Sequence, residues 1–191
     1  ERLDADPLPR HDRITVDLFA CETAMALSEA LYLLHDELVS LSPSLVARTR
    51  EAVLERVTVP VEHRQDIRWF SGFNNWTPWC AANTLGSAMY LLDDQARLAS
   101  LAARLNVFVD RFIDGYGADG GCDEGPSYWN VAAGALFLYL DMLYERTDGA
   151  VNLFDEPLIA RMAHYAVSMH LDGPWVANFA DAQAPGRIKS G

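Results

Sequence analysis

Two segments of the chain hold residue types suited to chemistry on a sugar. The first, residues 69–79, reads Trp-Phe-Ser-Gly-Phe-Asn-Asn-Trp-Thr-Pro-Trp. An aromatic ring covers the flat face of a pyranose, and a side-chain amide bonds hydroxyls or a carboxylate. The aromatic residues alone favour a loop anchored to the core. Asn74 and Asn75, however, come directly before a predicted helix start, where free backbone N–H groups face the same space, and this favours a ligand site.

The second segment, residues 115–130, is rich in glycine and carries three acids, Asp119, Asp123 and Glu124. Their spacing is not that of an EF-hand, so the segment gives only weak support for a calcium loop. Tyr128 is expected in the first turn of a helix, where the helix dipole would ease ionisation of its phenol. Taken alone, the segment favours an ordinary half-buried tyrosine over this functional interpretation.

The elements that must position these residues are helices. Apolar residues recur at helical spacing almost throughout, and no segment alternates with period two for long enough to predict a strand. Start and stop signals divide the pattern into six main helices. These run from near Thr15 to Leu38, from Ser42-Pro43 to Val57, from Thr77-Pro78 to Asp93-Asp94, from Leu98 to Asp114-Gly115, from Pro126 to Thr147, and from Asp155 to before Gly173-Pro174. The sequence predicts an all-α fold.

The connections between these helices alternate between short and long. The long ones are residues 58–76, residues 115–125 and everything after His170. If consecutive helices run antiparallel, all the long connections emerge at the same end of the helical scaffold. Function is expected where long loops converge, and His170, predicted to close the sixth helix, is the histidine that this argument places there.

Composition excludes several other classes of protein. The chain has 191 residues, of which 50% are apolar, so it can bury a core and is not disordered throughout. A net charge of -12 argues against binding nucleic acid or an anionic membrane. The apolar runs are too short to span a bilayer, and no signal segment opens the chain. Three cysteines without metal-type spacing predict neither a disulfide framework nor a metal site, and no cofactor is expected.

Several segments together resemble the heparinase II/III-like polysaccharide lyases. The matching residues are 17–24, 74–76, 119–129 and 178–182. The resemblance implies an incomplete (α/α) toroid of antiparallel helical hairpins over residues 1–191. It also implies a longer protein that continues into a β-sandwich, and a periplasmic or secreted location.

The reaction that this resemblance implies is β-elimination at a uronic acid. A base removes the proton at C5, and the 4-linked oxygen leaves as a double bond forms. Carried over to this sequence, Asn75 would bind the carboxylate, and Tyr128 would act as the acid, with the role of base also open to it. Asn74 and Glu124 would support them. The remaining expected substrate contacts are Trp76, Trp79, Trp129 and Arg68.

Two features depart from the family pattern. Trp76 stands where the family often has a histidine directly after the asparagine. A further catalytic histidine of the family often comes from a part of the fold that lies outside this chain. His170 is the residue of this sequence expected to take its catalytic role. These departures leave open an altered substrate or impaired chemistry.

The partner implied is a uronate-containing polysaccharide or oligosaccharide. The charge of -12 favours a sparsely charged uronate glycan over a highly sulfated one such as heparin. Two alternatives stay open. One is a glycoside hydrolase using Asp119, Asp123 or Glu124 as a carboxylate pair, and the other is a non-catalytic glycan-binding domain.

Overall fold

The computed structural model describes residues 14–182, and these are predominantly helical, which confirms the all-α class. Their contacts divide them into two compact units. The first unit holds residues 14–71 and 83–107, and the second holds residues 72–82 and 108–182. Helices α5 (Trp76–Leu91) and α6 (Gln95–Asp114) contribute residues to both units. The single toroid domain expected for residues 1–191 stays a prediction.

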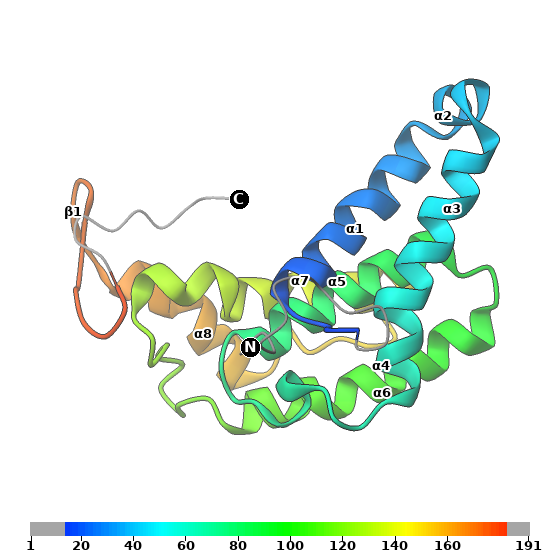
Figure 1. Cartoon of the computed structure of the whole chain (residues 1–191). Helices are drawn as coiled ribbons and strands as arrows, with labels where there is room; N and C mark the ends of the chain where they lie inside the picture. Colours follow the sequence, from blue (N-terminus) through cyan, green and yellow to red (C-terminus); the bar gives the residue numbers. More distant parts are fainter. Residues whose placement is uncertain (1–13, 183–191) are drawn as a thin grey trace, which may run out of the picture. The chain divides into compact units, whose positions relative to one another are not determined.

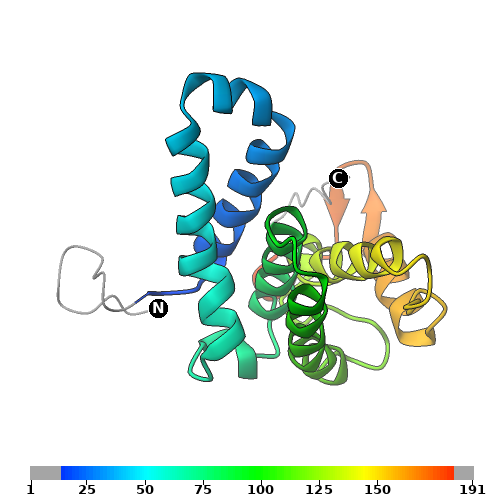
Figure 2. The same cartoon turned by 90° about the vertical axis from the view of Figure 1, so that its right-hand side faces the viewer.

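The first unit is built on an antiparallel pair of helices. Helix α1 (Leu18–Leu33) and helix α3 (Pro43–Val53) lie side by side, and the short helix α2 (His35–Leu41) joins them (Figures 1 and 2). The helix after Ser42 continues beyond Val53, through a π-helical turn (Leu54–Thr58) and helix α4 (Val59–His63). The connection expected from residue 58 is therefore helical as far as His63, and Arg68–Ser71 forms a 3-10 turn.

Local capping explains where the first helices begin. The Asp17 side chain accepts a hydrogen bond from Ala20 N at 2.9 Å, so α1 starts at Leu18. Ser42 caps α3, and Pro43 occupies its first turn, as the sequence predicts. The first predicted helix is wrong in its length, because it breaks at Leu34 and resumes as α2.

Small side chains line the buried face of α1. The Ser28 hydroxyl lies 2.9 Å from the Ser87 hydroxyl of α5, and Thr84 donates to the Cys21 sulfur at 3.6 Å. Side chains of this size let two helices approach closely. The indole of Trp69 donates to the Val16 carbonyl at 3.1 Å, so this aromatic residue anchors its loop to the core.

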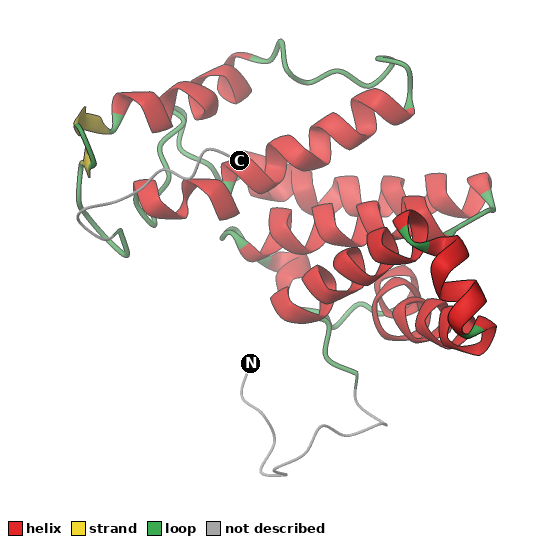
Figure 3. Cartoon of the chain, turned by 90° about the horizontal axis from the view of Figure 1, so that it is seen from above, coloured by secondary structure: helices red, strands yellow, loops and turns green. Residues whose placement is uncertain are grey.

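The second unit contains two further helices and a small hairpin. A 3-10 helix (Pro126–Val131) leads into α7 (Ala133–Arg146), and α8 (Pro157–Ser168) follows. Strand β1 (His170–Asp172) then pairs antiparallel with β2 (Trp175–Val176), shown in yellow in Figure 3. The buried apolar side chains of this unit include Phe112, Leu136, Tyr139, Leu140, Ile159 and Met162.

Two sequence predictions are wrong in this unit. The α-helix expected from Pro126 begins at Ala133, because Gly125 (φ 92°) leads into a 3-10 helix and Ala132 has a non-helical backbone. His170 does not close a helix, because α8 ends at Ser168 and His170 lies in a strand.

Helix α8 holds the glycine-rich loop in place. Arg161 Nε donates to the Ala118 carbonyl at 2.7 Å, and the Tyr165 hydroxyl donates to the Cys122 carbonyl at 3.3 Å. Gly120 has φ +80°, and a Cβ there would lie 2.5 Å from the Arg161 carbonyl carbon. The loop is therefore a fixed element that positions the residues after it. Within the described part of the chain, no helix combines the length and the apolar character needed to cross a membrane.

Candidate functional site

Asn74 and Asn75 form the start of α5. The Asn75 carbonyl accepts from Trp79 N at 3.2 Å, and Asn74 Oδ1 accepts from Trp76 N at 3.3 Å. Asn74 is exposed and acts as a helix cap, which is also the ordinary structural role of an asparagine there. Trp76 and Trp79 are half-buried in the first turn of the same helix.

Asn75 is largely buried but is not fully shielded from solvent. The residue is 8% exposed, and its amide makes no hydrogen bond with the described residues. Among those residues, two side-chain oxygens, those of Thr58 and Tyr116, are fully buried and have no hydrogen-bond partner, and the Asn75 amide is not in this group. The amide of Asn75 therefore has no hydrogen-bond partner among residues 14–182 and keeps only slight contact with solvent.

Glu124 meets Asn75 in the folded chain. The backbone N–H of Asn75 donates a hydrogen bond to the Glu124 carboxylate. Burial raises the pKa of the Glu124 carboxyl, the Asn75 N–H opposes this rise, and the Asp181 carboxylate adds to it. The structure thus brings together two residues predicted separately from the two segments.

A second contact also joins the two segments. A Cβ on Gly115 would lie 2.6 Å from the Phe73 ring, so this ring covers the backbone at the start of the glycine-rich loop. Phe73 itself is 65% exposed and does not anchor its loop in the core, in contrast to Trp69.

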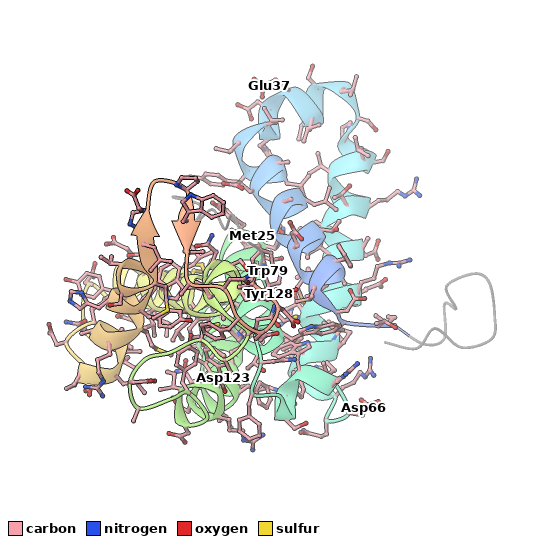
Figure 4. The ribbon with its side chains drawn as sticks, turned by 90° about the vertical axis from the view of Figure 1, so that its left-hand side faces the viewer. Met25, Glu37, Asp66, Trp79, Asp123 and Tyr128 are labelled. Carbon is pink, nitrogen blue, oxygen red and sulfur yellow. The ribbon has the colours of Figure 1, made fainter. Side chains whose placement is uncertain are left out.

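Tyr128 lies in the 3-10 helix, with its N–H bonded to the Gly125 carbonyl at 3.1 Å. The side chain is half-buried, and its hydroxyl has no hydrogen-bond partner in residues 14–182 and is not sealed from solvent. Because α7 begins only at Ala133, the expected help from the dipole at a first α-helical turn does not apply. Figure 4 labels Tyr128 and Trp79, which both belong to the second unit.

Three other predicted site residues have structural partners or lie elsewhere. The indole N–H of Trp129 donates to the Met162 carbonyl at 2.7 Å, so this hydrogen-bond donor already has a partner in α8. The exposed His170 places Nε2 2.9 Å from the Gly173 carbonyl, within its own hairpin. Arg68 is exposed and belongs to the first unit, so its expected substrate contact stays a prediction.

The acidic residues of the loop have different surroundings. Asp119 Oδ1 accepts from Gly121 N at 2.9 Å and stabilises a turn. Asp123 is exposed on the loop (Figure 4). Among the described residues, no three or more His, Cys, Asp or Glu side chains are grouped so as to hold a metal ion.

Sequence reasoning missed a buried cluster beneath the site. Tyr116, which follows the end of α6, has a buried hydroxyl beside the Cys122 thiol. Burial raises the pKa of this thiol and raises the pKa of Tyr165 to about 12. These side chains are neutral at physiological pH, so they hold the loop rather than take part in proton transfer. Tyr116 and Cys122 belong to the same loop, whereas Tyr165 comes from α8, and no local pattern predicts the contact between this loop and α8.

Sequence reasoning also gave no role to Asp181. Its N–H donates to the Glu124 carbonyl at 3.2 Å, which brings the C-terminal described segment to the site. The site therefore offers the Asn75 amide together with the Glu124 carboxyl, whose pKa is raised. Such groups can bind an anion by hydrogen bonding and transfer protons. No protein-family model and no curated protein matches this chain.

Proposed function

We propose that this chain is part of a polysaccharide lyase that cleaves a uronate-containing glycan by β-elimination. The observation that carries the proposal is the open Asn75 amide at the start of α5, beside the Glu124 carboxyl. An amide binds a carboxylate without adding charge, and the neighbouring helix N-terminus also favours an anion. The resemblance to heparinase II/III-like lyases supports the same reaction.

The proposed reaction needs little beyond Asn75 and Tyr128. The Asn75 amide hydrogen-bonds the uronate carboxylate and so stabilises the negative charge that develops when C5 loses its proton. A general base accepts that proton, a role that is open to Tyr128, and the electron pair of the C5–H bond forms the C4–C5 double bond. The 4-linked oxygen leaves with the electrons of its bond to C4 and takes the proton from Tyr128.

The architecture that we propose is an incomplete (α/α) toroid within a longer protein. The antiparallel pair α1 and α3 is the kind of hairpin from which such a toroid is built. A further histidine would come from outside this chain, since His170 bonds within its own hairpin. We propose a sparsely charged uronate glycan as the substrate, on the basis of the net charge of -12.

The test is product absorbance from the new double bond, measured with the protein that contains this chain and a 4-linked polyuronate. We expect absorbance to rise with the wild type. Tyr128→Phe should lower the rate by about 10²- to 10⁴-fold, the usual contribution of general acid–base catalysis. Tyr144→Phe is the matched control, because Tyr144 is exposed on α7 and its ring makes an edge-to-face contact with Phe154. Undiminished activity in Tyr128→Phe would reject the assignment.

The raised pKa of Glu124 favours one alternative, a glycoside hydrolase with Glu124 as general acid. Asp119 suits the second carboxylate less well, because it already bonds Gly121 N. Products without an unsaturated end, together with loss of activity in Glu124→Gln, would support the hydrolase over the lyase.

A further inference from the structure

Helix α1 is apolar on two opposite faces. One face packs within the first unit, and its buried residues are Cys21, Ala24, Ser28 and Leu31. The opposite face is apolar too but is largely exposed, and the residues of this outer face of α1 are Phe19, Ala26, Leu27, Ala30 and Leu33. A helix that is apolar all round is normally buried, so the outer face of α1 is suited to a partner.

The outer face has the spacing that a second helix recognises. Phe19, Ala26 and Leu33 follow one another at intervals of seven residues, so they line up along α1 (Figure 1). Phe19 is 75% exposed and Leu33 is 66% exposed. At 1.5 Å per residue they lie about 21 Å apart along the axis, which is about four turns of a docked helix. A large side chain at each end can anchor that helix, and the alanines between them let it approach closely.

Acidic side chains border one edge of the outer face. Glu22 and Glu29 are exposed, lie seven residues apart, and make no ion pair within residues 14–182. In the same unit, by contrast, Glu62 pairs with Arg97 at 2.7 Å. Residues 18–41 contain four Asp or Glu and no Lys or Arg. The charge that complements this edge therefore has to come from a basic partner.

We propose that the outer face of α1 binds an amphipathic helix of another protein. Its apolar residues contact Phe19 and Leu33, and its Lys or Arg side chains pair with Glu22 and Glu29. A second copy of α1 fits less well, because it carries the same acidic edge and would add like charge to the interface. The inference does not depend on the proposed function.

The first experiment measures the binding of two synthetic amphipathic peptides to the full chain by isothermal titration calorimetry. Both peptides carry leucine at positions spaced alternately by three and four residues, and the flanking positions hold lysine in one peptide and glutamate in the other. We expect the lysine peptide to bind at least about tenfold more tightly at low salt, and high salt to narrow this difference. Equal binding of the two peptides, or no binding of either, would overturn the inference.

The second experiment separates the acidic edge from the net charge of the chain. The double variant Glu22→Gln, Glu29→Gln should bind the lysine peptide about three- to tenfold more weakly than the wild type, as for the loss of two exposed ion pairs. The control Asp141→Asn, Glu145→Gln removes the same charge from two exposed positions of α7 and should keep the wild-type affinity. An equal loss in both double variants would overturn the inference.

The third experiment tests the apolar contact. Leu33→Gln should weaken binding of the lysine peptide by about tenfold. Val167→Gln on α8 is the control, because Val167 is also exposed (73%), and it should leave the affinity unchanged. Since both positions are exposed, both variants should melt close to the wild type. Unchanged affinity in Leu33→Gln would overturn the inference.

Sedimentation of the chain without peptide tests for a second copy. We expect a single copy at micromolar concentration. A dimer that Leu33→Gln separates would assign the outer face of α1 to self-association and would overturn the inference.

Discussion

The side chains at the centre of the account are held in different ways. Two interactions hold the backbone of Asn75. Its N–H bonds to the Glu124 carboxylate, and its carbonyl accepts the N–H of Trp79 in the first turn of α5. Its amide is thereby left for a ligand. Tyr128 lies in a short 3-10 helix directly after Gly125, whose φ of 92° suits glycine, so its position depends on the loop before it.

At the residue scale, we predict that Glu124→Gln stabilises the protein at neutral pH. The folded-state pKa of Glu124 is raised, so its contribution to stability is full at acid pH and is lost as pH rises through the folded pKa. Thermal melting at a pH below about 4, where unfolded glutamate is protonated, should give similar midpoints for wild type and variant. At pH 8 the variant should melt higher.

Glu145→Gln on α7 is the control for this measurement, because Glu145 is exposed. Its melting midpoint should differ from that of the wild type by similar amounts at both pH values. A Glu124→Gln variant that melts below the wild type at pH 8 would contradict the burial argument.

At the element scale, α8 fixes the loop that carries Glu124, and we predict that Gly120→Ala is destabilising. The alanine would take up φ +80° and would place its Cβ against the backbone of Arg161. The expected cost is about 1–3 kcal/mol, seen as a shift of the urea midpoint.

Gly117→Ala is the matched control in the same loop. Its φ is not positive, and its new Cβ would meet the end of the Asp119 side chain, which can move. The control should therefore lose less stability than Gly120→Ala, and equal losses in the two variants would contradict the packing of the loop on α8.

Local signals predicted some elements well. Ser42-Pro43 marks the start of α3, and Asp114 ends α6, because capping and chain-breaking residues act within one turn. Pro126 carries the same start signal, but there the signal is overridden by tertiary packing. The Trp129 indole is tied to α8, and the 3-10 turn precedes the true helix start. The β1–β2 hairpin was missed because its strands have three and two residues, too few to show an alternation.

The candidate site was predictable only in part. Asn75 and Glu124 could each be selected from their local sequence, because an asparagine before a helix and an acid after glycines are local patterns. Their contact, and that of Asp181 with Glu124, join residues far apart in the chain. His170 was selected because it was predicted to close a helix, but α8 ends at Ser168 and His170 lies in strand β1.

At the scale of the whole molecule, the net charge of -12 acts on any polyanion that approaches. We predict faster turnover of a nonsulfated polyuronate than of heparin at low salt. Added salt shortens the Debye length to about 8 Å at 0.15 M, so it should improve binding of heparin more than binding of the nonsulfated polymer. Initial rates and affinities over a salt series measure this, and stronger heparin binding at low salt would show a local cationic surface that overcomes the net charge.

We propose that the Asn75 amide and the Tyr128 phenol act on one sugar. A crystal structure of the Tyr128→Phe variant with a bound 4-linked glucuronate tetrasaccharide tests it directly. We expect the carboxylate of one glucuronate to lie within hydrogen-bond distance of the Asn75 amide, with the ring of residue 128 beside C5 and O4 of that same sugar. A tetrasaccharide that contacts the two residues through different sugars, or that binds away from Asn75, would contradict it.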